Sequence, residues 1–161
     1  MNRIQQLCAA LRTARRMTLG LLADIPHEKW TWQLFEGQNH VAWTCLHLVL
    51  ADDWGPTSVG QREKPFVDRW EALVSAGPDP DPARWPSPDA LLEMMAQAHA
   101  RYLSCLEALT DDDLTRPTQG ALAPFAPVFG CLVDSHVWHE GFHGGQIAVI
   151  RKALNLPPAW G

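Results

Sequence analysis

The C-terminal part of the chain contains the segment SHVWHEGFHGGQI, residues 135–147. In an α-helix successive residues are rotated by about 100°, so His136, His139 and His143 fall within about 60° of one another. The same stripe carries the apolar residues Leu132, Ile147 and Ile150. Because the apolar stripe of an amphipathic helix faces the protein core, this segment predicts a helix that buries several imidazoles.

Helical periodicity recurs in four parts of the chain, and no part shows the alternation of a half-buried strand. The expected long helices cover residues 2–23, 40–54, 88–106 and 124–154, and a shorter helix is expected inside the proline-rich stretch 57–86. That stretch makes a long connection between the second and third long helices. The sequence therefore predicts an all-α, four-helix bundle with a crossover between helices 2 and 3, as a single domain over residues 1–161.

Local signals mark the ends of these helices. Asn39 is the expected N-cap of the second long helix, and Ser87 followed by Pro88 is typical of a helix start. Thr110 begins a T-x-x-D pattern of the capping-box type. Asn155 can adopt the left-handed conformation that ends a helix, and the prolines that follow it prevent continuation.

The composition restricts the partners that we expect. With 13 basic and 18 acidic side chains the net charge is −5, so the chain lacks the basic surface that binding to nucleic acid requires. The sequence contains no run of about 18 apolar residues, which is the length that a transmembrane helix needs. We therefore expect no membrane partner. The four cysteines show no C-x-x-C spacing and are expected as buried, reduced residues of a cytoplasmic protein: Cys8, Cys45, Cys105 and Cys131.

His139 and His143 lie one helical turn apart, so both imidazoles could reach one cation at about 2.0–2.1 Å. With Glu140 they form the H-E-x-x-H pattern of zinc proteases. Those proteases take a third ligand from further along the chain, whereas residues 144–161 contain no His, Asp, Glu or Cys. A third protein ligand is therefore expected from an earlier helix.

His47 is the best candidate for this third ligand. It lies in the middle of the second long helix, on one face with Trp43, Leu50 and Trp54. Three histidines leave coordination positions open, which is typical of catalytic rather than structural zinc sites. Trp43 and Trp54 are candidate walls of a substrate pocket, and His40, two turns from His47, is expected at the rim.

The remaining polar residues near these histidines allow more than one interpretation. Glu140 is a candidate catalytic base or hydrogen-bond acceptor, with a surface or interhelical contact as the alternative. His136 could be a further ligand, or a residue that supports or packs against the site. Asp52 and Asp53 point away from the His47 stripe, which favours solvation or an ion pair over metal ligation.

The sequence resembles the DinB/YfiT-like superfamily of metal-binding helical bundles. The resemblance extends over nearly the whole chain in the family's order. It rests on Trp32, Gly37, Asn39, Trp43, His47 and Leu48, on the turn from Leu109 to Leu114, on the pattern His139-Glu140-x-x-His143-x-Gly145-Gln146-Ile147, and on Arg151, Leu154, Leu156 and Pro157.

This resemblance implies a four-helix bundle, often a homodimer, that binds a divalent metal through His47, His139 and His143. Relatives in the family include thiol transferases that use bacillithiol, mycothiol or glutathione, a mycothiol-dependent isomerase, and proteins called metal-dependent hydrolases. Many relatives have an arginine where this chain has Gly144. Any contact made by that arginine, for example to an anion, is therefore missing here.

Three hypotheses follow. The first is a metal-dependent enzyme, a low-molecular-weight-thiol S-transferase or a hydrolase, that acts on a small molecule. Zinc is the expected metal, with nickel, iron or manganese as alternatives because imidazole binds several of these ions. The second is a non-catalytic bundle that binds a metal or small ligand. In the third, the histidines are hydrogen-bonded core residues.

Overall fold

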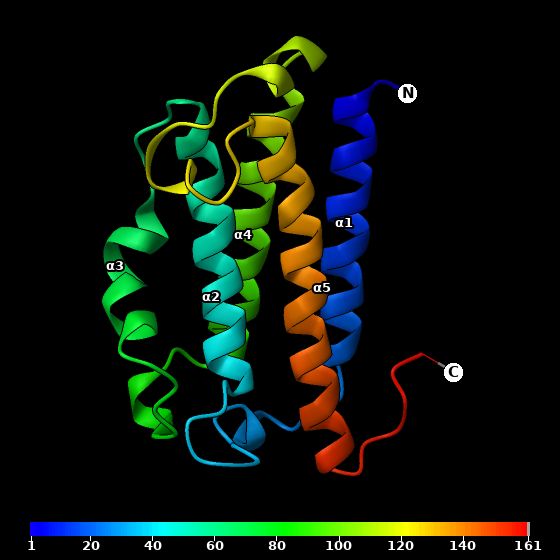
Figure 1. The fold of residues 1–161 in the computed structure, drawn as a ribbon. Helices are drawn as coiled ribbons and strands as arrows, with labels where there is room; N and C mark the ends of the chain where they lie inside the picture. The colour runs from blue at the N-terminus through cyan, green and yellow to red at the C-terminus, as the bar shows by residue number, and fades with distance from the viewer. Residues whose placement is uncertain (161) are drawn as a thin grey trace.

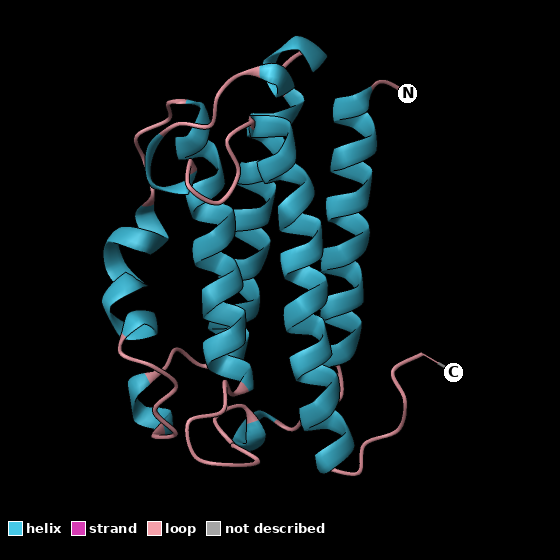
Figure 2. Cartoon of the chain, viewed as in Figure 1, coloured by secondary structure: helices cyan, strands magenta, loops and turns pink. Residues whose placement is uncertain are grey.

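The computed structural model describes residues 1–160, which form five α-helices joined by loops and short 3-10 turns (Figure 1). Within this range no residue belongs to a named strand, and a single antiparallel bridge joins Pro117 and Val128 (Figure 2). The helices are α1 (Arg3–Leu22), α2 (Val41–Trp54), α3 (Pro65–Ser75), α4 (Pro88–Glu107) and α5 (Phe129–Ala153).

The four long helices form a bundle in which α1 packs most extensively on α5, and α2 packs on α4. Contacts of α1 with α4 and of α2 with α5 complete the ring. The helices α1 and α5 run in one direction and α2 and α4 in the other (Figure 1). Because α3, packed against α2, returns the chain to the other end of the bundle, the predicted all-α bundle with a crossover is confirmed.

Capping agrees with the predictions at the start of α4, at the end of α5 and at the Thr110 capping box, and α1 has a capping box that was not predicted. Asn2 and Gln5 form a reciprocal capping box at the start of α1, and the Ser87 hydroxyl accepts a hydrogen bond from the backbone N–H of Ala90. Asn155 follows α5 with φ 57°, in the left-handed region. These groups satisfy backbone donors and acceptors that a helix leaves without intrahelical partners.

The start of α2 differs from the prediction. His40, not Asn39, is the N-cap: its Nδ1 accepts the backbone N–H of Trp43 at 3.1 Å. Its Nε2 donates to the carbonyl oxygen of Asp79 at 3.0 Å, and its side chain is fully buried. The expectation of His40 as a rim residue was therefore wrong, because the loop that precedes α4 covers this end of α2.

The start of α5 also differs from the prediction. The helix begins at Phe129 rather than near Pro124. Before it, Pro127 accepts a hydrogen bond from the backbone N–H of Thr118, and Phe129 donates to Arg116. Since proline has no N–H and clashes with the preceding turn, Pro127 is incompatible with a helix interior, and this segment pairs with residues 116–118 instead.

The core consists of two apolar clusters. One is formed mainly by α2, α4 and the end of α5, and includes Leu46, Leu91, Met95, Ile147 and Ile150. The other lies at the opposite end of the bundle and includes Leu7, Leu11, Tyr102, Phe129 and Leu132. On α1, α4 and α5 the residues between these clusters include buried polar side chains, namely Arg15, His99 and Glu140.

These polar side chains form one hydrogen-bonded layer across the bundle. Arg15 donates to both carboxylate oxygens of Glu140, at 2.7 and 2.9 Å, and to Asp52 Oδ2 at 3.1 Å. It also donates to the carbonyl oxygen of Met95, and Asp52 contacts His99 Nδ1 at 3.0 Å. All four long helices therefore contribute to this layer, in which a buried charge has the partners that burial requires.

The four cysteines differ in their burial. Cys8, Cys45 and Cys105 are buried free thiols as predicted, but Cys131 is exposed on the outer face of α5.

None of the helices in the described part of the chain is both long enough and apolar enough to cross a lipid bilayer.

The His40 cap predicts a pH dependence of stability. Burial lowers the pKa of His40 below its usual value, so the folded state keeps it neutral while the unfolded chain binds a proton below about pH 6.5. We expect the free energy of unfolding to fall as the pH falls from 7 to 5, and to fall less in His40→Asn, whose amide can cap without titrating. Urea unfolding at each pH measures this difference. Equal pH slopes in the wild type and in His40→Asn would contradict the prediction.

The polar layer predicts a loss of stability in Glu140→Gln. Removing this charge from the buried ion-pair network costs on the order of 3 kcal/mol, because Arg15 then keeps only Asp52 as a charged partner. The matched control is Glu107→Gln, whose pair with Arg12 is about half exposed, 51% for each side chain, and should cost less than about 1 kcal/mol. Urea denaturation at pH 7 compares the two variants. Equal losses of unfolding free energy in the two variants would contradict a structural role for the buried pair.

Candidate metal centre

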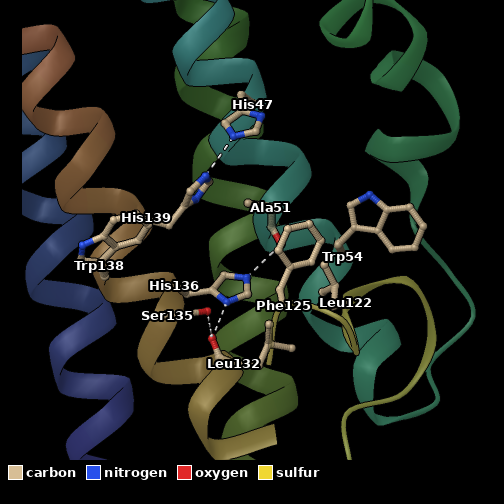
Figure 3. A pocket seen from close by; sticks show the side chains of 10 residues that line it. All are labelled: His47, Ala51, Trp54, Leu122, Phe125, Leu132, Ser135, His136, Trp138 and His139. Carbon is tan, nitrogen blue, oxygen red and sulfur yellow. Dashed lines mark hydrogen bonds between the residues drawn. The ribbon is translucent and has the colours of Figure 1, made fainter. Parts of the chain in front are cut away.

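Three imidazoles from two helices meet at one point of the bundle. His47 lies in the middle of α2, and His139 and His143 lie one turn apart on α5. The Nε2 atom of His139 is 2.9 Å from that of His47 and 3.1 Å from that of His143. Figure 3 shows the rings of His47 and His139 pointing toward each other between their helices. All three residues have a possible ligand atom within 4.8 Å of the others.

The surroundings keep these imidazoles neutral. Burial, and then the proximity of His143, lowers the pKa of His47 to about 4. Burial, followed by the neighbouring histidines, lowers the pKa of His139 to about 3. Burial also lowers the pKa of His143, against the opposing effects of Gln146 and Glu140. At neutral pH each ring is therefore uncharged and keeps a nitrogen lone pair, which is the form that binds metals.

Neighbouring side chains hold two of the rings in place. The indole of Trp43 stacks on His47, with centroids 4.8 Å apart and planes 13° from parallel, and its Nε1 donates to the carbonyl oxygen of Val74. His143 Nδ1 donates to Gln146 Oε1 at 2.9 Å. This hydrogen bond leaves the proton on Nδ1 and directs the lone pair of Nε2 toward the other histidines.

The arrangement fits a divalent cation. Nitrogen ligands at about 2.0–2.1 Å from a tetrahedral ion lie about 3.3–3.4 Å from one another, close to the spacings of 2.9 and 3.1 Å found here. Three neutral imidazoles that meet through Nε2 cannot all satisfy one another by hydrogen bonds, because each ring has only one proton. A cation accepts all three lone pairs at once.

Glu140 is not part of this group of ligand atoms, although it follows His139 directly. Both of its carboxylate oxygens bind Arg15 on α1, and its side chain is buried. This is the interhelical contact that was the alternative interpretation of Glu140. Glu140 is therefore part of the polar layer, and its candidate role as a catalytic base stays a prediction.

The other candidate residues lie around the centre. His136 contacts the carbonyl oxygens of Leu132 and Ala51 through its two ring nitrogens, at 3.0 and 3.2 Å, and is not in the cluster. Asp52 and Asp53 are buried in ion pairs with Arg15 and Arg101, so the ion-pair alternative holds and solvation does not.

Arg15 was not among the residues predicted to have a role. The helical periodicity of α1 does indicate that Arg15 is buried, because it lies on one stripe with apolar and small residues. These are Ile4, Cys8, Leu11, Thr18 and Leu22. An arginine at such a position needs an acidic partner from another helix. Periodicity alone does not say which of the carboxylates supplies it.

A cavity of about 410 Å³ opens beside the imidazoles, between α2, α5 and the loop that precedes α5 (Figure 3). His47 and His139 form part of its wall, and Trp54 lines it as predicted. Trp43 instead packs on the far side of His47 and is not a lining residue. The remaining lining residues are Ala51, Leu122, Phe125, Leu132, Ser135, His136 and Trp138.

Comparison with known proteins agrees with this architecture. Residues 10–147 match the family model described as the DinB superfamily. The chain is also 27% identical, over 149 residues, to a protein of Geobacillus kaustophilus (strain HTA426) that is named "Putative metal-dependent hydrolase". That alignment covers 92% of this chain and 80% of the relative. Bundle, histidine cluster and family match together identify this chain as a member of the DinB superfamily.

Proposed function

We propose that this protein is a metal-dependent enzyme that acts on a small molecule. His47, His139 and His143 hold the divalent cation, and the adjoining cavity binds the substrate. The observation that carries the proposal is the convergence of three neutral imidazoles at the wall of a cavity large enough for a small ligand. The similarity to a protein named as a metal-dependent hydrolase also supports it.

A divalent cation at this position acts as a Lewis acid and lowers the pKa of a water or thiol that reaches it. The residues of the chain provide the rest of the site. Trp43 keeps the His47 ring in place, and Gln146 keeps the lone pair of His143 Nε2 available. Because His47 and His139 border the cavity, a ligand bound there approaches the cation from the cavity side.

Two reaction classes are compatible with this site. Hydrolysis is the activity in the name of the Geobacillus relative. Transfer of a low-molecular-weight thiol to an electrophile is the activity that the family resemblance suggests. We place hydrolysis first and thiol transfer second. A non-catalytic protein that binds a metal or small ligand is the alternative function, and the homodimer suggested by the resemblance stays a prediction.

Metal binding provides the first test. We expect the purified protein, incubated with zinc and then freed of excess metal, to retain about one ion per chain by elemental analysis. His47→Ala and His143→Ala should retain less than about a tenth of this amount, because two imidazoles bind too weakly. His27→Ala, outside the cluster, is the control and should match the wild type. Equal loading of all variants would contradict the assigned ligands.

Turnover provides the second test. Metal-loaded protein is assayed with a panel of small esters, amides and lactones, and with thiols paired with epoxides or alkyl halides. We expect the protein to turn over compounds of one panel. The turnover rate should fall about 100-fold in His139→Ala and should not fall in His27→Ala. Activity in the first panel assigns a hydrolase, and activity in the second assigns a transferase. Turnover that survives in His139→Ala would exclude this centre, and binding without turnover would favour the alternative function.

A further inference from the structure

Within the described part of the chain, the cavity beside the imidazoles has a lining without charged side chains. Among the described residues that line it, none is Lys, Arg, Asp or Glu. Aromatic and aliphatic side chains make up most of its wall, including Trp54, Leu122, Phe125, Leu132 and Trp138. Such a wall favours a ligand with apolar surface, since moving that surface out of water stabilises binding.

The polar atoms of the lining residues are largely engaged with the protein itself. The Ser135 hydroxyl donates to the carbonyl oxygen of Leu132 at 2.7 Å. Both ring nitrogens of His136 contact backbone carbonyl oxygens, as the dashed lines in Figure 3 show. The Nε2 atoms of His47 and His139 face each other at the edge of the cavity, 2.9 Å apart. The indole N–H groups of Trp54 and Trp138 are further polar groups of the lining residues, and both are uncharged.

One ammonium group lies close to a lining residue but does not line the cavity. Lys64 Nζ lies 4.8 Å from the centroid of the Trp54 ring, but Lys64 is not a lining residue. Its charge is paired with Asp68, at 2.6 Å. A carboxylate or sulfonate placed in the cavity would lose its hydration without meeting a cationic side chain, which is costly.

We propose that this site takes an uncharged, largely apolar ligand, with an aromatic or aliphatic body in the cavity and one metal-binding head beside His47 and His139. This inference rests on the proposed function for the identity of the head group. It selects against ligands that carry a carboxylate on the part that lies in the cavity, glutathione among them. Trp54, Phe125 and Trp138 act as the specificity-determining residues for the body.

Two fluorescent probes with the same ring system test the proposal on metal-free protein. N-phenyl-1-naphthylamine is uncharged, and 8-anilino-1-naphthalenesulfonate has the same skeleton with one sulfonate. We expect the uncharged probe to bind wild-type protein at least about tenfold more tightly, because only the sulfonate loses hydration without compensation. Equal affinity, or tighter binding of the sulfonate, would overturn the inference.

Variants locate the bound probe. Ala51→Phe fills the cavity and should weaken binding of the uncharged probe by at least about tenfold. Ala9→Phe is the matched control, because Ala9 lines a separate groove between α1 and α5. If only Ala9→Phe weakens binding, the probe occupies that groove and the assignment is wrong.

A third variant tests the role of charge. Ser135→Arg adds a cation to the cavity wall and should shift the affinity ratio toward the sulfonate by at least about fivefold. An unchanged ratio would overturn the inference, even if Ala51→Phe does not fold. Since these measurements need no metal, they separate a wrong ligand class from a wrong metal-centre assignment, which only the metal-loading experiment addresses.

Discussion

The buried guanidinium of Arg15 constrains how the four long helices can pack. It binds Glu140 on α5, Asp52 on α2 and the carbonyl oxygen of Met95 on α4. Burial alone would raise the pKa of Asp52, but the opposing effects of Arg15 and then His99 are larger and lower it. A helix that slides by one residue moves its side chains by about 1.5 Å, which is enough to break these contacts. The layer therefore sets the height of each helix in the bundle.

The polar layer lies next to the imidazoles. Glu140 directly follows His139 on α5, and Asp52 lies five residues beyond His47 on α2. Arg15 therefore joins α2 and α5 close to the turns that carry the histidines. In the same part of the bundle His47 contacts His139, across 92 residues of sequence. The ion-paired carboxylates and the proposed cation site are thus neighbours in the structure.

Burial gives the histidine cluster its chemical character. Desolvation keeps the rings neutral and leaves three lone pairs directed at one small volume. Without a cation the cluster gains little from hydrogen bonds among its members, whereas a bound ion would stabilise the folded state. The cavity next to it presents apolar walls, so the strongest polar interaction available to a ligand lies at the imidazoles.

Local sequence determined the helices, the caps at the start of α4 and the end of α5, and the i, i+4 spacing of His139 and His143, because these depend only on the geometry of one helix. The apolar stripes also predicted that His47 faces the same core. Only the tertiary structure decided that His40 is buried under the loop before α4, that α5 starts after Pro127, and that Glu140 pairs with Arg15. A periodic pattern shows which face of a helix is buried, but not which side chain of another helix meets it there. The partner of Glu140 and the shape of the cavity depend on packing between segments that are distant in the sequence.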